Sequence, residues 1–372
     1  MATRRRKVRY AVVGLGYFAQ TAVLPAFAHA TKNSELVALV SDDPTKRKKL
    51  GKKYGVEKSY SYEQFGDCLA SAEVDAVYIA LPNHLHRDYA VAASRAGVHV
   101  LCEKPMAVTE QQCEDMIRAA EEGGVRLMIG YRLHFEEANL KAAEIVQSGK
   151  LGRPRVFSSV FTMRVEDEDN IRLNPIARGG GTLYDIGIYC INAARSLFRA
   201  EPTEVVAFGA NGGDPKLRDI DEMTSAVLRF PDERLAAFTS SFGAAAHASY
   251  RVVGTRGDLE VQSAYEFAQP IRHVLTIGEK KTEKTFPKRD QVAPEILRFS
   301  ECVIEEKEPE PSGREGLADV RIIRALYRSA EEGRPVRLAE YEKERRPTIR
   351  QEVRRPPVRK PDLVRASPPS AE

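Results

Sequence analysis

The apolar residues of the first 130 positions fall into short runs separated by amphipathic segments. The runs predict buried strands at 8–13, 36–40, 75–81, 99–102 and 126–130. Helical patterns lie between several of them, at 21–30, 88–96 and 109–122, and Pro25 is expected to bend or end the first of these helices. Strands and helices that alternate in this way predict a doubly wound α/β domain with a parallel sheet.

From about residue 131 the pattern changes to a series of strand-like runs, many of them joined by short connections. Strands are expected at 154–163, 204–209, 224–230, 234–242, 249–253, 258–261 and 273–277, and helices at 135–148, 182–198, 293–307 and 316–332. This second pattern predicts a C-terminal α/β domain built on a large, mainly antiparallel open sheet. We therefore divide the chain into domains at 1–130 and 131–340, followed by a tail at 341–372.

The run at 8–13 leads directly into a glycine motif, Gly14-Leu-Gly16-Tyr17-Phe18-Ala19, which opens the first helical segment. In this context Gly14 permits a tight turn, Gly16 lets the backbone approach a pyrophosphate, and Ala19 allows close packing of helix on strand. The N-terminus of the helix offers N–H groups to the phosphates. The first domain is therefore expected to be a Rossmann domain that binds a dinucleotide.

The residues after the second strand bear on the choice of cofactor. In NAD enzymes an acidic residue at this point binds the ribose 2′-hydroxyl. Here the position is held by Ser41, which leaves room for a 2′-phosphate, and Lys46 can neutralise its charge. This favours NADP over NAD, although Asp42 could serve as the ribose acid.

Further cofactor contacts are expected at the carboxyl ends of later strands. We assign this role to residues of the predicted crevice: Leu81, Asn83, His86, Glu103, Lys104 and Arg132. His84 and His86 could in principle form a metal pair, but no cluster of cysteines or carboxylates accompanies them, so no metal is expected.

Charge and composition exclude other classes of protein. The chain carries 57 Lys and Arg against 53 Asp and Glu, and the tail holds nine and five of these, so the rest carries 48 of each sign. A neutral globule argues against nucleic-acid binding.

No apolar run is long enough for a membrane helix. The basic lead at 3–7 resembles an export signal, but its apolar run stops at Gly14 and is already used as a strand. Five unpaired cysteines then favour a cytoplasmic protein.

Four motifs in order carry a resemblance to a known family. They are Gly14-Leu-Gly16, Cys102-Glu103-Lys104-Pro105, Ile129-Gly130-Tyr131-Arg132, and the segment from Gly180 to Tyr189 that contains Asp185. Together they resemble the glucose–fructose oxidoreductase, inositol dehydrogenase and rhizopine-catabolism (Gfo/Idh/MocA) oxidoreductase family. The resemblance covers about 8–336 and is closest to the sugar oxidoreductase branch.

The resemblance implies a catalytic pair, Lys104 and Tyr189, with Asp185 nearby. It also implies a sugar substrate held by Tyr131, Lys104, Asp185 and Tyr189, NADP that can stay tightly bound, and a homo-oligomer, a dimer, formed through the C-terminal sheet. The exported members of the branch have a long N-terminal arm, which this sequence lacks.

The implied chemistry is oxidation of an aldose at C1 to an aldonolactone, with hydride transfer to the nicotinamide. A free tyrosine has a pKa of about 10, too high for a base at neutral pH. A nearby ammonium favours the tyrosinate, so Tyr189 is the hypothetical acid/base, Lys104 its electrostatic partner and Asp185 the orienting group. A second sugar can act as hydride acceptor in this branch.

Two alternatives stay open. Other members of the family oxidise inositols or dihydrodiols, and one relative is a non-catalytic dinucleotide-binding sensor.

The tail at 341–372 is rich in arginine and proline, which is typical of a disordered or extended segment. Binding of the tail to an acidic partner or a phosphate surface is an alternative.

Overall fold

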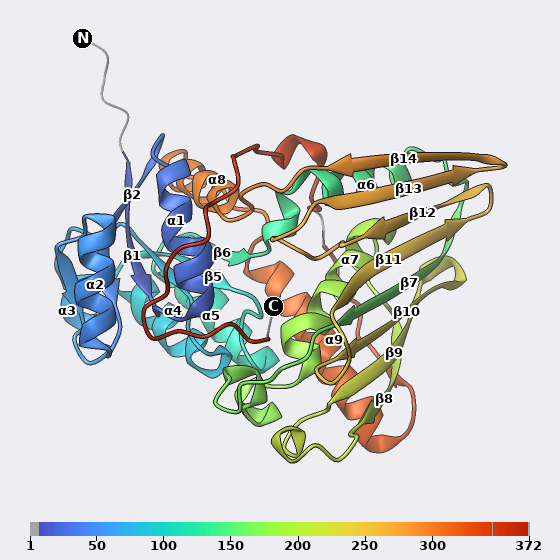
Figure 1. The fold of residues 1–372 in the computed structure, drawn as a ribbon, viewed down its shortest axis with the longest axis horizontal. Helices are drawn as coiled ribbons and strands as arrows, with labels where there is room; N and C mark the ends of the chain where they lie inside the picture. Colours follow the sequence, from blue (N-terminus) through green and yellow to red (C-terminus); the bar gives the residue numbers. More distant parts are fainter. Residues whose placement is uncertain (1–6, 344, 371–372) are drawn as a thin grey trace, which may run out of the picture. The chain divides into compact units, whose positions relative to one another are not determined.

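A computed structural model describes residues 7–343 and 345–370, which form two compact units (Figure 1). Among these described residues, unit 1 comprises those up to Arg132 together with Arg289–Leu317 and Arg354–Pro368. Unit 2 comprises the described residues of 133–288, 318–353 and 369–370. The basic lead at residues 3–6 lies outside the described residues. Among the described residues, no helix combines the length and apolar character needed to cross a membrane.

Unit 1 is built on the predicted parallel sheet, which has six strands in the order β3-β2-β1-β4-β5-β6. The strands are β1 (Val8–Val13), β2 (Ser34–Val40), β3 (Lys58–Tyr60), β4 (Ala76–Ile79), β5 (His99–Glu103) and β6 (Leu127–Gly130). The strand order reverses at β1, which lies between β2 and β4. Ligands of open α/β sheets bind at such a switch point, outside the carboxyl ends of the strands.

The helices of unit 1 begin and end largely where local signals predict. Their bounds are η1 (Ala19–Val23), α1 (Leu24–Ala26), η2 (Phe27–His29), α2 (Pro44–Tyr54), α3 (Phe65–Ala70), η3 (Asn83–Leu85), α4 (His86–Arg95), α5 (Glu110–Glu122) and α8 (Ala293–Ile304). Pro25 does not end the first helix, because the chain stays helical from η1 through α1 to η2. Strand β3 and α3 were not predicted, since both are short.

Helix α8 is distant in sequence but belongs to unit 1. The hydroxyl of Tyr10 on β1 is hydrogen bonded to the Ser300 hydroxyl at 2.7 Å, and the Asn33 amide donates to the Leu297 carbonyl at 2.9 Å. These buried polar contacts tie α8 to the strands of the sheet.

Unit 2 contains a nine-stranded sheet in the order β14-β13-β12-β11-β7-β10-β9-β8-β15. The strands are β7 (Pro154–Thr162), β8 (Glu204–Ala210), β9 (Met223–Phe230), β10 (Arg234–Ser241), β11 (His247–Gly254), β12 (Gly257–Gln262), β13 (Ile271–Ile277), β14 (Lys280–Phe286) and β15 (Val336–Arg337). Only β7 and β10 pair in parallel, which confirms the mainly antiparallel prediction. Strand β14 was missed because its sequence, KKTEKTF, is almost wholly polar.

Helices cover one face of this sheet (Figure 1). They are α6 (Glu137–Gln147), the π-helical segment η7 (Leu183–Gly187), α7 (Ile188–Phe198) and α9 (Gly313–Glu332). The remaining turns are η4 (Arg132–His134), η5 (Ile171–Leu173), η6 (Ile176–Arg178), η8 (Pro215–Leu217), η9 (Pro231–Glu233) and η10 (Ile349–Gln351). The predicted helix over 182–198 is therefore a π turn that continues as an α-helix. Such π turns occur often at functional sites.

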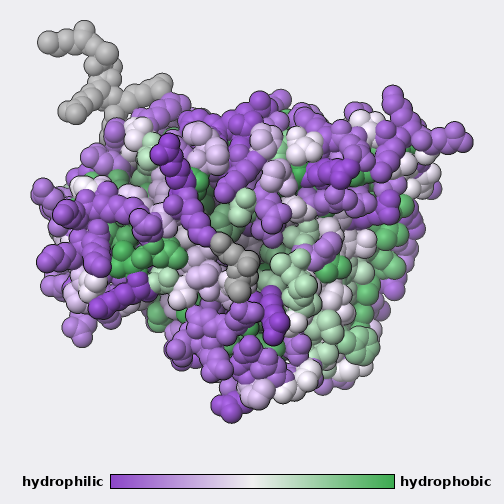
Figure 2. Space-filling view, viewed as in Figure 1, coloured by the Kyte–Doolittle hydropathy of each residue, from purple (hydrophilic) through white to green (hydrophobic). Residues whose placement is uncertain are grey.

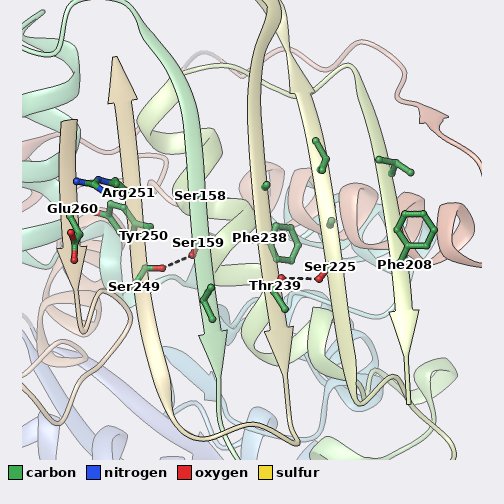
Figure 3. A pocket seen from close by; sticks show the side chains of 15 residues that line it. Ser158, Ser159, Phe208, Ser225, Phe238, Thr239, Ser249, Tyr250, Arg251 and Glu260 are labelled. Atoms are coloured by element: carbon green, nitrogen blue, oxygen red, sulfur yellow. Dashed lines mark hydrogen bonds between the residues drawn. The ribbon is translucent and has the colours of Figure 1, made fainter. Parts of the chain in front are cut away.

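The other face of the sheet is apolar and exposed. Hydrophobic residues, green in Figure 2, gather over strands β7 to β10 at the right of the view. Seven of the nine exposed large apolar residues of the described chain lie on this face: Val156, Val160, Phe208, Met223, Val227, Leu235 and Val253. Figure 3 shows a shallow hollow on this face, in which the hydroxyls of Ser225 and Thr239 are hydrogen bonded at 2.8 Å. We name it the outer sheet face.

Candidate functional site

The glycine loop of unit 1 has the geometry that a pyrophosphate requires. Gly14 has a φ of +94°, and a Cβ there would lie 2.4 Å from the carbonyl oxygen of Ala80, so no other residue fits. In front of Gly16, by contrast, a Cβ would meet no heavy atom within 4 Å. The backbone at Gly16 is thus exposed at the start of a helical segment, and the N–H groups of such a terminus suit an anion.

The other residues of the motif surround this loop. Ala19 is buried on the helix and Leu81 is buried beneath Gly14, whereas Tyr17 and Phe18 are half-buried. Gln20, which sequence analysis did not single out, is almost completely buried and donates its amide N–H to the carbonyl of Leu15 at 3.0 Å. Gln20 therefore holds the loop from behind.

The residues after β2 form a small polar site. Ser41 is buried, and its hydroxyl accepts a hydrogen bond from the N–H of Asp43 at 3.3 Å. Asp43 caps α2 by accepting from the backbone N–H groups of Thr45 and Lys46. Burial opposes ionisation of Asp43, but these N–H groups and nearby Arg365 hold its pKa below the usual range.

Asp42, the alternative ribose acid, is engaged elsewhere. Its carboxylate accepts a hydrogen bond from the backbone N–H of Tyr62 at 2.8 Å. The side chain thus braces the segment after β3.

The predicted cofactor contact at His86 has a different role in the structure. The ring is completely buried, and its two nitrogens lie 2.9 Å from the carbonyl oxygen of Pro105 and 2.8 Å from that of Leu81. His86 therefore joins the loop after β4 to the loop after β5, and we assign it a structural role. Asn83, in the same loop, is half-buried. No group of three or more metal-ligating side chains occurs among the described residues.

Lys104 follows β5 and comes directly after a buried carboxyl, that of Glu103. Glu103 is buried and accepts a 2.6 Å hydrogen bond from the hydroxyl of Tyr78. Burial raises the pKa of Glu103, while the Tyr78 hydrogen bond and the charge of Lys104 oppose that rise. Glu295 on α8 is also completely buried, and neither of its carboxyl oxygens has a hydrogen-bond partner among the described residues. Burial, and then the charge of Glu103, raise the pKa of Glu295 well above its usual value.

The residues after β6 are buried within the protein. Arg132 donates to the side-chain oxygen of Gln291, and both side chains are nearly inaccessible. Tyr131 is buried too. Arg132 also stabilises the ionised form of Glu295, so its charge partly opposes the effect of burial on this carboxyl.

In unit 2, Asp185 is held by a residue that sequence analysis missed. Arg172 donates from Nε to the Asp185 carboxylate at 2.5 Å. The triple glycine makes this possible: a Cβ on Gly180 would lie 1.6 Å from the carbonyl oxygen of Asn174, and Gly181 N–H donates to the Arg172 carbonyl at 3.0 Å. Only glycine lets these two segments approach so closely.

Tyr189 lies in the first turn of α7, after the π turn that contains Asp185. Its ring packs edge-on against Phe161, with centroids 5.6 Å apart, and tilted against Tyr265 at 5.8 Å. Tyr265 is in turn fixed by a 2.7 Å hydrogen bond to the hydroxyl of Ser159. This cluster orients the Tyr189 ring while leaving the residue half-buried.

Each unit thus assembles part of the predicted set. Unit 1 brings together the glycine loop, Ser41, Lys46, Glu103 and Lys104 around one sheet, and unit 2 brings together Asp185 and Tyr189. Residues such as Gln20, Tyr78, Arg172 and Glu295 were missed because polar residues within apolar or loop segments carry no periodic signal.

Two family profiles match this chain, one in each unit. A profile of the family described as "Oxidoreductase family, NAD-binding Rossmann fold" matches residues 8–131, and one described as "GFO/IDH/MocA C-terminal domain" matches residues 139–260. The D-xylose 1-dehydrogenase [NADP(+)] of Haloarcula marismortui is 33% identical over 89% of this chain and 93% of its own.

Two solved structures are also similar. Aldose–aldose oxidoreductase from Caulobacter crescentus, complexed with glycerol, is 39% identical with a TM-score of 0.85, over 90% of this chain and all of its own. A 3-ketoreductase from Actinomadura kijaniata, in complex with NADP and TDP-benzene, is 27% identical with a TM-score of 0.79, over 87% of this chain and 98% of its own.

Proposed function

We propose that this chain, which belongs to the Gfo/Idh/MocA oxidoreductase family, oxidises an aldose at C1 to the aldonolactone with NADP as cofactor. The observation that carries the proposal is the 39% identity to an aldose–aldose oxidoreductase, in a chain with an open glycine loop and the residues Lys104, Asp185 and Tyr189. The family also includes reductases of other sugars, so the assignment of an aldose as the substrate must rest on the site residues and not on the fold.

The proposed cofactor fits the chain's own donors. Gly16 offers open backbone to the pyrophosphate, and Ser41 with Lys46 offers a hydroxyl and a cation to the 2′-phosphate. The D-xylose 1-dehydrogenase that resembles this chain is named for NADP. These features support NADP over NAD.

When bound, NADP would supply a nicotinamide as the acceptor for the hydride of C1. In our proposal Tyr189 removes the proton of the C1 hydroxyl, and Lys104 donates a hydrogen bond to the same oxygen. Asp185, held in one orientation by Arg172, accepts a hydrogen bond from a sugar hydroxyl. Tyr131 is retained as a proposed substrate contact.

The central test removes one group, the hydroxyl of Tyr189. Tyr189→Phe should lose most turnover with aldoses while NADP affinity is unchanged, because the phenyl ring keeps the contacts with Phe161 and Tyr265. Tyr184→Phe, in the preceding π turn, is the matched control and should retain activity. Near-normal turnover of Tyr189→Phe would contradict the assignment.

We further propose that the cofactor stays bound and that a second sugar re-oxidises it, giving an alditol. Purified protein should then show the absorbance band of reduced nicotinamide after addition of glucose or xylose alone. A band that needs added NADP would indicate an ordinary dehydrogenase, and activity only with inositols or dihydrodiols would indicate another substrate class.

The five free thiols, four of them buried, support a cytoplasmic site of action.

We propose that the outer sheet face joins two copies of this chain. Large apolar side chains concentrate on this face, and Phe208 is 74% exposed. Patches of this kind mark protein–protein interfaces. Because the face is one continuous surface, an isologous pair would cover the same residues on both subunits.

A further inference from the structure

Residues Arg354–Pro368, which we name the C-terminal strap, run extended along unit 1 and pass beside α1 (dark red in Figure 1). The start of the strap is fixed at two points. Arg355 donates from Nε to the carbonyl of His29 at 3.0 Å, and the N–H of Asp290 donates to the Arg355 carbonyl at 3.3 Å. The strap is therefore part of the packed structure of this unit.

Towards its end the strap is tied to the glycine loop through Gln20. The N–H of Val364 donates to the Gln20 side-chain oxygen at 2.8 Å, and the Gln20 amide nitrogen donates to the Val364 carbonyl at 2.9 Å. The same amide nitrogen donates to the Leu15 carbonyl. One buried side chain thus connects the strap to the loop that is shaped for a pyrophosphate.

The next residue, Arg365, contacts the segment after β2, where the 2′ position of the adenosine ribose is expected to bind. Its φ is +47°, a left-handed conformation that residues other than glycine rarely adopt. In this conformation Nη1 lies 3.3 and 3.4 Å from the two carboxylate oxygens of Asp43, the cap of α2. The Arg365 side chain is 64% exposed, so most of its donors still face solvent.

The surroundings of Asp43 carry positive charge suited to a phosphate. Lys46 lies in the first turn of α2, and Arg47 follows it with an Nη1 atom that is buried without a hydrogen-bond partner among the described residues. Arg365 adds a third cation from a distant part of the chain. A guanidinium of this kind can bind phosphate through two parallel hydrogen bonds.

We propose that the C-terminal strap closes over the adenosine end of the dinucleotide site and that Arg365 binds the 2′-phosphate of NADP. The inference rests on the proposed use of NADP. Asp43 holds the guanidinium in place before the ligand arrives, which lowers the entropic cost of binding. The link through Val364 and Gln20 must open before the nucleotide leaves, so the strap slows its release.

Charge removal on the strap tests the phosphate contact. Nucleotide-free Arg365→Gln is compared with the parent and with Arg359→Gln, which removes the charge of an exposed arginine of the same strap. Calorimetric titrations use NADP and 2′,5′-ADP against NAD and 5′-AMP. We expect Arg365→Gln to weaken the binding of NADP and 2′,5′-ADP by roughly ten- to a hundredfold. The binding of NAD and 5′-AMP should be unchanged. Equal weakening of all four ligands, or of none, would overturn the contact.

The closing role is tested by the rate of release. Val364→Pro removes the N–H that Gln20 accepts, whereas Val358→Pro alters a residue whose N–H has no hydrogen-bond partner among the described residues. NADPH is chased from each complex and its fluorescence followed. Faster release from Val364→Pro alone supports the strap, and equal rates in all three proteins would overturn it.

The two proposals can fail separately. A parent protein that prefers NADP and loses this preference in Arg365→Gln, but oxidises no aldose, would overturn the proposed reaction and support the strap. A parent that oxidises aldoses with NADP while Arg365→Gln binds NADP normally would overturn the strap alone.

Discussion

Arg172 donates a hydrogen bond to Asp185 across 13 positions of sequence, at 2.5 Å, and both side chains are partly shielded from solvent. A carboxylate fixed in this way has one preferred direction for its remaining lone pairs. If Asp185 accepts from a sugar hydroxyl, its orientation enters directly into substrate binding.

We therefore expect Arg172→Gln to lower kcat/KM for aldoses by roughly tenfold, equivalent to about 1.4 kcal/mol, mainly through KM. The control is Arg164→Gln, since Arg164 is well exposed and forms only a 3.9 Å pair with Glu166. Steady-state kinetics on both variants check this, and an unchanged kcat/KM for Arg172→Gln would refute a positioning role.

Cofactor preference should respond to Ser41. A carboxylate in Ser41→Glu would repel a 2′-phosphate and could hold the ribose hydroxyls of NAD, so the ratio of NADP to NAD affinity should fall at least about tenfold. Asp42→Asn should leave the ratio nearly unchanged, because Asp42 is engaged with the Tyr62 N–H. A large shift in the Asp42 variant would instead identify Asp42 as the ribose ligand.

Glu295 should make stability depend on pH. Its pKa is raised well above the usual value in the folded protein by burial and by Glu103, whereas in the unfolded chain it stays near the usual value of about 4.3. The folded state therefore keeps a proton that the unfolded state releases. The free energy of unfolding should fall as pH rises above about 4.3, by at most about 1.4 kcal/mol per pH unit from this group.

Glu295→Gln removes this titration. We expect the parent to lose stability relative to Glu295→Gln as the pH rises above about 4.3, measured by urea unfolding at a series of pH values. Glu301→Gln on the same helix is the control, because its carboxylate is partly exposed and paired with Arg298. Parallel pH profiles for the parent and Glu295→Gln would show that the buried carboxyl ionises normally.

The outer sheet face should govern assembly. Phe208→Asp places a charge at the most exposed apolar side chain of this face, so a dimer formed there should dissociate into monomers, as measured by light scattering after gel filtration. Ile304→Asp alters an exposed apolar residue on α8 in unit 1 and should leave the mass unchanged. A Phe208→Asp protein with the parent's mass would place the interface elsewhere, or exclude one.

The sequence was sufficient for features that depend on near neighbours. Short apolar runs, several of them followed by helical patterns, were enough to predict the parallel sheet of unit 1, because burial on both faces of a strand leaves a continuous apolar run. Strand-like runs joined by short connections predicted β7 to β13. The almost wholly polar β14 could not be found in this way, since it joins the sheet through backbone pairing with β13.

The role of the glycine motif also depends on residues that are close together in the sequence. Gly14 and Gly16 act through their own backbone conformation and the space in front of them, and Ser41 follows a strand whose end was predicted correctly. These positions could therefore be identified before any fold was known.

The tertiary structure alone decided which distant polar groups meet. Gln20 and Val364 are separated by 344 positions, and Glu103 and Glu295 by almost two hundred, yet each pair shares one environment. Hydrogen bonds and charge interactions act over a few ångströms in space and leave no period in the sequence. The sequence by itself determined the strands, the glycine loop and the resemblance to a family; the folded chain determined that His86 braces a loop, that Arg172 holds Asp185, and that the C-terminal strap lies beside the nucleotide loop.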